Sequence, residues 1–260
     1  MGHVAHERGP SGEPRPGTRR LLALAVGLLC HGTFLAAVTA MFVALHGGLL
    51  SGRGRLAGSA GTVANAALAL QFPLAHSFLL TRRGRGLLGR LWSARFGRDL
   101  VPTSYAGIAA LQILATFVLW SPSGEVWLRP TGALLWAWTA AYLGAWAFLG
   151  KALVDGGLGL QTGWIGWSAV WRGQRVAFPP PATAGLFARC RQPIYLGFAL
   201  TLWTGPVWTP DRLLLATIWT AYCLVGPIHK ERRYLRMHAV AFAEYRARVP
   251  YMIPRLRRPA

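Results

Sequence analysis

Residues 21–50 read LLALAVGLLCHGTFLAAVTAMFVALHGGLL and contain no Asp, Glu, Lys or Arg. About 20 apolar residues cross a bilayer as a helix, whereas the apolar core of a signal peptide spans only about 7–15 residues. The run also follows directly on the Arg19-Arg20 pair. This stretch therefore predicts a first membrane helix rather than a cleaved leader.

Five more apolar runs follow, at about 59–80, 104–120, 131–154, 193–207 and 211–228. Together with the first run they predict an all-α, polytopic integral membrane protein with about six transmembrane helices. The last run begins at Thr209-Pro210-Asp211, which offers an N-cap, a proline at the first helical position and an acidic first turn. The Gly226-Pro227 pair predicts its end.

The charge is strongly basic, with 28 Lys and Arg against 8 Asp and Glu, for a net charge of +20. In a soluble protein this balance would indicate nucleic acid. Here the arginines gather in the tail, in the 81–103 and 155–192 loops and at the C-terminus. The positive-inside rule then predicts both termini in the cytoplasm and no nucleic-acid partner. We expect a multi-pass protein of the cell membrane, with a bacterial inner membrane favoured.

Three parts are predicted. Residues 1–20, rich in Gly, Pro, Arg and Glu, have no apolar period and predict a disordered cytoplasmic tail. Residues 21–154 form a four-helix membrane scaffold. Residues 155–260 form a C-terminal part, with a long cytoplasmic loop, a helix pair and a cytoplasmic helix from about 229 to 249. The three cysteines have no metal spacing, so no metal is predicted. The oligomeric state is not indicated.

A first candidate for chemistry is the stretch RQPIYLG at 191–197, where the loop enters the fifth run. Arg191 offers a fork for a carboxylate or another anion, and Tyr195 a ring and a hydroxyl to pack a ligand. A plain interface anchor is the alternative, because Arg and Tyr are common at membrane boundaries.

A second candidate is the helix after the membrane exit. Spacings of three and four place Glu231, Tyr234, His238, Phe242 and Tyr245 on one face of it, and all but Phe242 carry hydrogen-bonding groups. Glu231 suits hydroxyls or an ammonium group of a polar cofactor. It also suits local charge balance with its arginine neighbours, since surface ion pairs are common and weak.

Two further features complete the candidate residues. His76 is ionisable inside a membrane segment and is therefore a functional candidate, although a hydrogen bond to a neighbouring helix explains it as well. Residues 249–254, VPYMIP, have two prolines around apolar residues and predict an extended segment that folds back on the preceding helix or dips into the interface.

The C-terminal third resembles the membrane methyltransferases of the isoprenylcysteine carboxyl methyltransferase superfamily. The residues that carry the resemblance are Arg191, Pro193, Tyr195, Gly197, Glu231, Tyr245, Val249-Pro250 and Ile253-Pro254. More narrowly, the chain is similar to the nurim family, which includes bacterial methanethiol S-methyltransferases. That likeness extends to Gln71, His76-Ser77, Ser104-Tyr105, Trp120-Ser121-Pro122, Asp155, Gly159-Leu160-Gln161 and Asp211-Arg212-Leu213-Leu214.

The resemblance implies a methyltransferase that binds S-adenosylmethionine, its methyl donor, in a cytoplasmic pocket of residues 155–260. The expected acceptor is small, apolar and drawn from membrane lipid, with methanethiol giving dimethyl sulfide as the best candidate. Arg191 and His76 are the expected catalytic residues, with no general base assigned. Arg191 is also expected to take the cofactor carboxylate and Glu231 its ribose hydroxyls or amino group. The other expected cofactor-binding residues are Gln192, Tyr195, Gly197, His238 and Tyr245.

Three positions depart from the family pattern. Gln192 replaces a histidine, Lys230 replaces a glutamate and Phe242 stands where tyrosine is frequent. Two other functions stay open: a non-catalytic, nurim-like structural protein of the membrane, and O- or S-methylation of a lipid or secondary metabolite.

Overall fold

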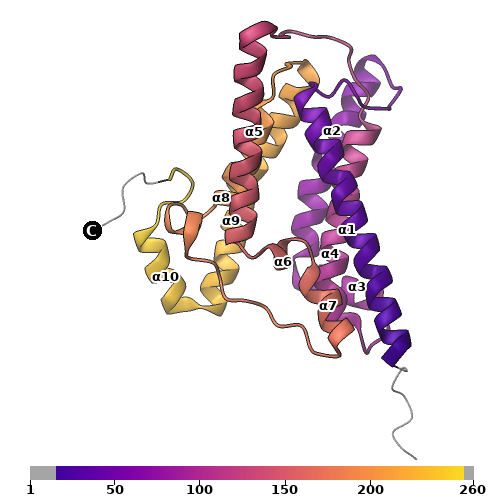
Figure 1. The fold of residues 1–260 in the computed structure, drawn as a ribbon, viewed down its shortest axis with the longest axis vertical. Helices are drawn as coiled ribbons and strands as arrows, with labels where there is room; N and C mark the ends of the chain where they lie inside the picture. The colour runs from indigo at the N-terminus through magenta and orange to yellow at the C-terminus, as the bar shows by residue number, and fades with distance from the viewer. Residues whose placement is uncertain (1–15, 255–260) are drawn as a thin grey trace, which may run out of the picture.

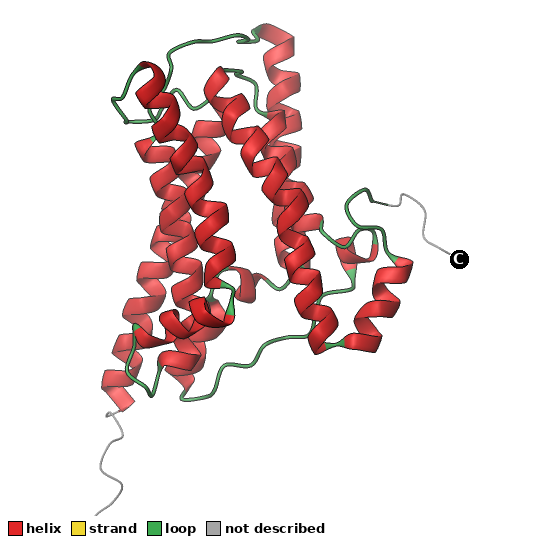
Figure 2. Ribbon diagram, turned by 180° about the vertical axis from the view of Figure 1, so that it is seen from behind, coloured by secondary structure: helices red, strands yellow, loops and turns green. Residues whose placement is uncertain are grey.

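The computed structural model describes residues 16–254 of the chain. Within this range the regular structure is helical, apart from one isolated β-bridge between Leu128 and Trp208 (Figures 1 and 2). The longer helices are α1 (Pro16–His46), α2 (Gly58–Leu79), α4 (Gly97–Leu119), α5 (Gly132–Asp155), α8 (Pro193–Thr204), α9 (Pro210–Met237) and α10 (Ala239–Arg248). The short ones are α3 (Arg82–Arg90), α6 (Leu158–Gln161), α7 (Trp164–Arg172) and the 3-10 helix η1 (Gly185–Ala188).

The predicted all-α membrane class is confirmed. Four of the described helices, α1, α4, α5 and α9, are long and apolar enough to cross a membrane, and α2 with the bent α3 would make a fifth. The remaining predicted run, 193–207, corresponds to α8, whose 12 residues rise only about 18 Å at 1.5 Å per residue. The number six and the side of the two termini therefore stay predictions.

The long helices form two neighbouring groups (Figure 1). In one group α1 packs along α4, and α2 packs on α4. In the other α8 packs between α5 and α9, and α2 also touches α9. α5 was expected in the N-terminal scaffold, but its most extensive packing is with α8, so the 154/155 boundary cuts through a packed unit.

One apolar core joins the two groups. Its largest buried side chains come from α1, α2, α4, α5, α8 and α9 and the residue that follows α4, and include Met41, Phe72, Phe117, Trp120, Tyr142, Leu202 and Trp219. Gly197 of α8 allows a close approach to α5, because a Cβ there would lie 2.9 Å from the Leu149 Cα atom. Burial of this kind stabilises by about 25 cal/mol per Å² of apolar area that leaves water.

A buried polar network closes the end of the bundle where α9 begins. The Asp211 carboxylate accepts hydrogen bonds from Trp120 Nε1 at 3.0 Å, Ser123 N at 2.8 Å and Asn65 Nδ2 at 3.3 Å. Asp211 does follow the Thr209 N-cap, as predicted, since Thr209 Oγ1 accepts from Arg212 N at 3.0 Å. The Asp211 side chain, however, also links the start of α9 to α2, to the end of α4 and to the loop that follows α4.

Three predicted boundaries are corrected. α1 begins at Pro16, so residues 16–20 are helix rather than tail, and residues 1–15 lie outside the described residues. α9 does not end at Gly226-Pro227 but runs through Pro227 to Met237. A proline removes one hydrogen bond, and membrane helices tolerate this when neighbours satisfy the freed carbonyl. The chain breaks instead at His238, before α10.

The predicted 155–192 loop also contains structure. α6, α7 and η1 lie within it, and α7 packs on α1 and α4. Trp164 and Trp171 of α7 are exposed, while Trp167 Nε1 donates to His31 Nε2 at 3.0 Å. Exposed tryptophans beside a packed face are typical of a helix at a membrane interface.

Candidate functional site

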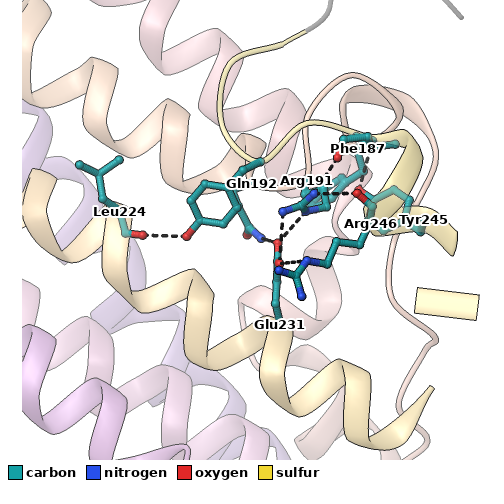
Figure 3. Close-up of polar contacts among 9 residues, drawn as sticks. Phe187, Arg191, Gln192, Leu224, Glu231, Tyr245 and Arg246 are labelled. Carbon is teal, nitrogen blue, oxygen red and sulfur yellow. Dashed lines mark hydrogen bonds and ion pairs between the residues drawn. The ribbon is translucent and has the colours of Figure 1, made fainter. Parts of the chain in front are cut away.

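A charged cluster lies where α8 begins, at the end of the bundle that carries α10. We call Arg191, Gln192, Glu231 and Arg246 the Glu231 cluster (Figure 3). Glu231 Oε1 accepts from Arg191 Nε at 2.8 Å and from Gln192 Nε2 at 2.7 Å. Glu231 Oε2 lies 3.8 Å from Arg246 Nε. Only 5% of Glu231 is exposed, so its charge is stabilised by these partners and not by water.

The local sequence explains why Arg191 and Gln192 face α9. Pro193 occupies the first position of α8, where its missing N–H would be unpaired anyway and its φ suits a helix. Gln192 is the N-cap residue and therefore lies at the turn into the helix. One helical turn along α9 from Pro227, Glu231 points back at this turn.

Arg191 also ties down the C-terminal strap, which we define as residues 249–254. Its Nη1 donates to the Arg246 carbonyl at 2.9 Å and to the Val249 carbonyl at 2.8 Å. Its own backbone N–H donates to the Pro250 carbonyl at 2.9 Å. The Tyr251 hydroxyl then donates to the Leu224 carbonyl on α9 at 2.7 Å. The strap thus folds back over α8 and α9, and Arg191 uses most of its donors inside the protein.

Tyr245 anchors α10 in the same region. Its hydroxyl donates to the Phe187 carbonyl of η1 at 2.7 Å, and burial raises the pKa of Tyr245 (Figure 3). Phe242 packs beside it with ring centroids 5.7 Å apart. Tyr245 holds α10 against η1, and Phe242 packs on Tyr234 of α9, with ring centroids 5.4 Å apart. The sequence pattern did not distinguish these structural contacts from ligand binding.

Gln192 leaves one polar atom without a partner. The side chain is 1% exposed, and its Oε1 is buried and makes no hydrogen bond. A buried acceptor left unpaired costs about 1–3 kcal/mol. A ligand with an N–H or O–H donor would remove this cost at a position where Glu231 supplies a carboxylate nearby. The residues present therefore fit a polar ligand with amino or hydroxyl groups.

A second cluster lies further along α8 and α9, toward the middle of the bundle. We call His76, Tyr105, Tyr195 and Tyr222 the tyrosine–histidine cluster; they come from α2, α4, α8 and α9. The Tyr105 hydroxyl is hydrogen-bonded to His76 Nε2, and His76 Nδ1 is buried without a partner. Ring centroids lie 6.3 Å apart for His76 and Tyr222, and 6.2 Å apart for Tyr222 and Tyr195.

The structure brings some of the predicted residues together and separates others. Arg191, Gln192 and Glu231 meet in one cluster, and His76 and Tyr195 share the second. His238 is exposed at the break between α9 and α10. Gly197 faces Leu149 of α5 rather than either cluster.

The sequence reasoning missed Tyr222 and gave Tyr105 no role. Their signal was present, because a tyrosine hydroxyl in an apolar run needs a partner that another helix must supply.

The fold and these clusters define a polytopic α-helical membrane protein with a buried polar site at one end of the bundle. Methanethiol S-methyltransferase 2 of Bradyrhizobium diazoefficiens is 27% identical over 189 residues, which cover 71% of this chain and 70% of that protein. Methanethiol S-methyltransferase 1 of the same organism is 26% identical over 199 residues, covering 74% of this chain and 66% of that protein.

Nurim of Xenopus laevis is 44% identical over 50 residues, which cover 19% of this chain and 18% of that protein. The resemblance to the nurim and methanethiol S-methyltransferase family is confirmed by these relatives. The first two alignments span about two thirds of the relatives' own length. No family model matches the sequence, and no solved structure matches it.

Proposed function

We propose that this protein is a methyltransferase that uses S-adenosylmethionine to methylate a small, apolar acceptor, with methanethiol as the favoured substrate and dimethyl sulfide as the product. The names of the relatives support a methyltransferase. The observation that carries the proposal is the unpaired Oε1 of Gln192, buried beside the Glu231 carboxylate, because it is an acceptor that awaits a donor.

In this proposal the Glu231 cluster holds the cofactor. Gln192 Oε1 accepts a hydrogen bond from a donor such as the cofactor's amino group. Glu231 accepts a further N–H or O–H of the cofactor with the lone pairs that its protein partners do not use. The role of Arg191 differs from the expected one. Its contacts with Glu231 and the strap make it a positioning residue that orients the carboxylate, rather than a free ligand for the cofactor carboxylate.

Gln192 and Glu231 would hold S-adenosylmethionine, which would supply a methyl group carried on a sulfonium. The protein then needs to bind, orient and exclude water. In this proposal an apolar acceptor arrives from lipid at the tyrosine–histidine cluster, whose residues come from the long helices α2, α4, α8 and α9. His76 and the tyrosine hydroxyls offer it hydrogen-bonding groups in a largely apolar setting.

Titration of the purified protein with S-adenosylhomocysteine tests the cofactor, and headspace analysis of dimethyl sulfide tests the acceptor. We expect saturable binding and product formation that depends on both methanethiol and donor. If the protein binds S-adenosylhomocysteine but methylates only a larger thiol or a hydroxyl acceptor, that acceptor would replace methanethiol as the proposed substrate. Failure to bind S-adenosylhomocysteine would leave the alternative, a non-catalytic, nurim-like role.

A further inference from the structure

Lys230 carries an ammonium group that makes no ion pair with a carboxylate among residues 16–254. The residue is half-buried on α9, and its Nζ lies 5.1 Å from the centroid of the Tyr195 ring. The neighbouring Glu231 carboxylate acts on this charge only through space, beyond ion-pair distance. The chain's other lysine, Lys151, is more exposed and pairs with Asp155. A cation out of water and without an anion is costly, and a ring face offsets only part of that cost.

The neighbours of Lys230 separate it from the ion pairs of the Glu231 cluster. Glu231 is adjacent in sequence, but its carboxylate is turned to Arg191 and Gln192. The Tyr195 ring lies next to both Lys230 and Tyr222, so Lys230 borders the tyrosine–histidine cluster. The charged and titratable groups around it are Glu231, Arg233 and Tyr222 on α9, Tyr195 on α8, and beyond them His76 on α2 and Tyr105 on α4.

We propose that Lys230 is the counter-charge for an anionic methyl acceptor, a small alkyl thiolate, bound beside Tyr195 in the tyrosine–histidine cluster. This inference rests on the proposed function and names the charge state of the substrate at that same site. A thiol attacks as its thiolate, and an ammonium group within a few ångströms in a low-dielectric site favours the ionised form. The thiol proton goes to bulk water. The thiolate then supplies the electron pair of the new bond, and the pair of the broken bond stays on the donor's sulfur.

The proposal also gives a reason for the two departures at positions 192 and 230. A chain with Gln192 lacks a titratable ring at the start of α8, and Gln192 binds Glu231 as a neutral donor. A glutamate at position 230 would repel a thiolate, whereas Lys230 attracts it. Gln192 and Lys230 therefore fit one site, in which a fixed cation rather than a proton acceptor favours ionisation of the thiol.

Kinetics on the full-length protein in lipid nanodiscs test the role of Lys230. The variants are K230M, which removes the charge, and K230R, which keeps it. K151M is the matched control, because it removes the chain's other lysine, which is exposed on α5 and pairs with Asp155. We expect K230M to lose roughly tenfold in kcat/KM for methanethiol near pH 7 and to recover part of this at higher pH, since a shift of about one pH unit in thiol ionisation is a factor of ten. S-adenosylhomocysteine affinity should stay at the wild-type value, and K230R should retain most of the rate.

Each other outcome has a separate meaning. Equal kinetics and pH profiles for K230M and K151M would overturn the inference and leave the proposed function intact. Weaker S-adenosylhomocysteine binding by K230M would also overturn it, because Lys230 would then serve the cofactor carboxylate. A wild-type protein that neither binds S-adenosylhomocysteine nor methylates a thiol would refute the proposed function itself.

A spectroscopic test does not depend on turnover or on the stability of a variant. The sequence contains two lysines, so protein labelled with ¹³C at the lysine Cε gives two side-chain signals, which K151R assigns. We expect methanethiol, added with S-adenosylhomocysteine, to shift the Lys230 signal and to leave that of Lys151 in place. An unchanged Lys230 signal at a thiol concentration that saturates the rate would overturn the inference.

Discussion

Arg191 and Glu231, 40 residues apart in the sequence, form a buried ion pair with Nε and Oε1 2.8 Å apart. The sequence pattern assigned both residues to one ligand. The structure makes each the partner of the other and makes Arg191 the link from Glu231 to the strap. Stability and ligand binding at this pair can therefore be separated by experiment.

The first prediction uses a double-mutant cycle. R191A should lower the free energy of unfolding by about 3–5 kcal/mol, because it leaves the Glu231 carboxylate buried and poorly paired. R191A/E231Q should be more stable than R191A, since the orphaned charge is gone. Both should bind S-adenosylhomocysteine at least about tenfold more weakly. Thermal unfolding in micelles and titration calorimetry measure the two quantities.

The control for this cycle is R232A, which removes an exposed arginine beside Glu231. It should change neither quantity. A lower stability of R191A/E231Q than of R191A would contradict the buried ion pair between Arg191 and Glu231.

The second prediction concerns topology and follows from the arginines in the loops. Reporters fused after Ala260 and in the turn at Thr81 should report the cytoplasm, and one between Ser121 and Pro130 the outside. An exported C-terminal fusion would put the Glu231 cluster on the side without cofactor, and the proposed function would fail.

The third prediction concerns the Asp211 network at the opposite end of the bundle. D211A removes an acceptor that Trp120, Ser123 and Asn65 share. It leaves Trp120 Nε1 and Ser123 N unpaired, whereas Asn65 Nδ2 still donates to the Ser121 carbonyl at 2.7 Å. We expect a loss of about 2–4 kcal/mol in stability from the unpaired groups. S-adenosylhomocysteine affinity, measured below the melting point, should be unchanged. A selective loss of affinity would place the ligand near α9's start.

The sequence pattern predicted the class of fold more accurately than it predicted where the helices end. Length and hydropathy fix membrane spans, so the runs at 21–50 and 131–154 correspond to α1 and α5. Gly226-Pro227 was misleading, because a proline ends an isolated helix but tertiary and membrane surroundings carry α9 past it. α7 was missed because its signal is amphipathic spacing of tryptophans over only nine residues.

The site was predicted only in part, and for a physical reason. Arg191, Gln192 and Glu231 do lie in contact, but a sequence pattern does not say whether charged residues pair with each other or bind a ligand. Their role at a site stays a prediction. His238 was placed on the Glu231 face by helical spacing, which holds only while the helix is unbroken. The break at His238 turns it to the surface.

The fourth prediction uses Cys190 to report on the strap. The thiol is buried beside Arg191, and burial raises the pKa of Cys190. Because maleimides react with the thiolate, labelling of the wild-type protein should stay slow up to the ordinary thiol pKa, near pH 8.5. R191A releases the strap and should speed the labelling of Cys190 in a C30A/C223A background. Mass spectrometry of labelled peptides measures this, and fast labelling of the parent protein would contradict the closed strap.

The last prediction concerns Gln192, where the family pattern has histidine. Gln192 donates to Glu231 through Nε2 and keeps Oε1 unpaired. A histidine can donate to the same carboxylate oxygen with one ring nitrogen and accept with the other, so Q192H preserves both functions. If position 192 orients Glu231 and meets the cofactor, Q192H should leave the rate of thiol methylation and its pH dependence close to wild type. Q192L, which removes both groups, should weaken S-adenosylhomocysteine binding by roughly tenfold, the worth of one hydrogen bond to a charged group. Initial rates against pH for the three proteins, with methanethiol and with a non-thiol acceptor, decide between orientation and proton transfer. A large gain for Q192H that is confined to the thiol would make position 192 a proton acceptor, and would move the preparation of the thiol from Lys230 to the start of α8.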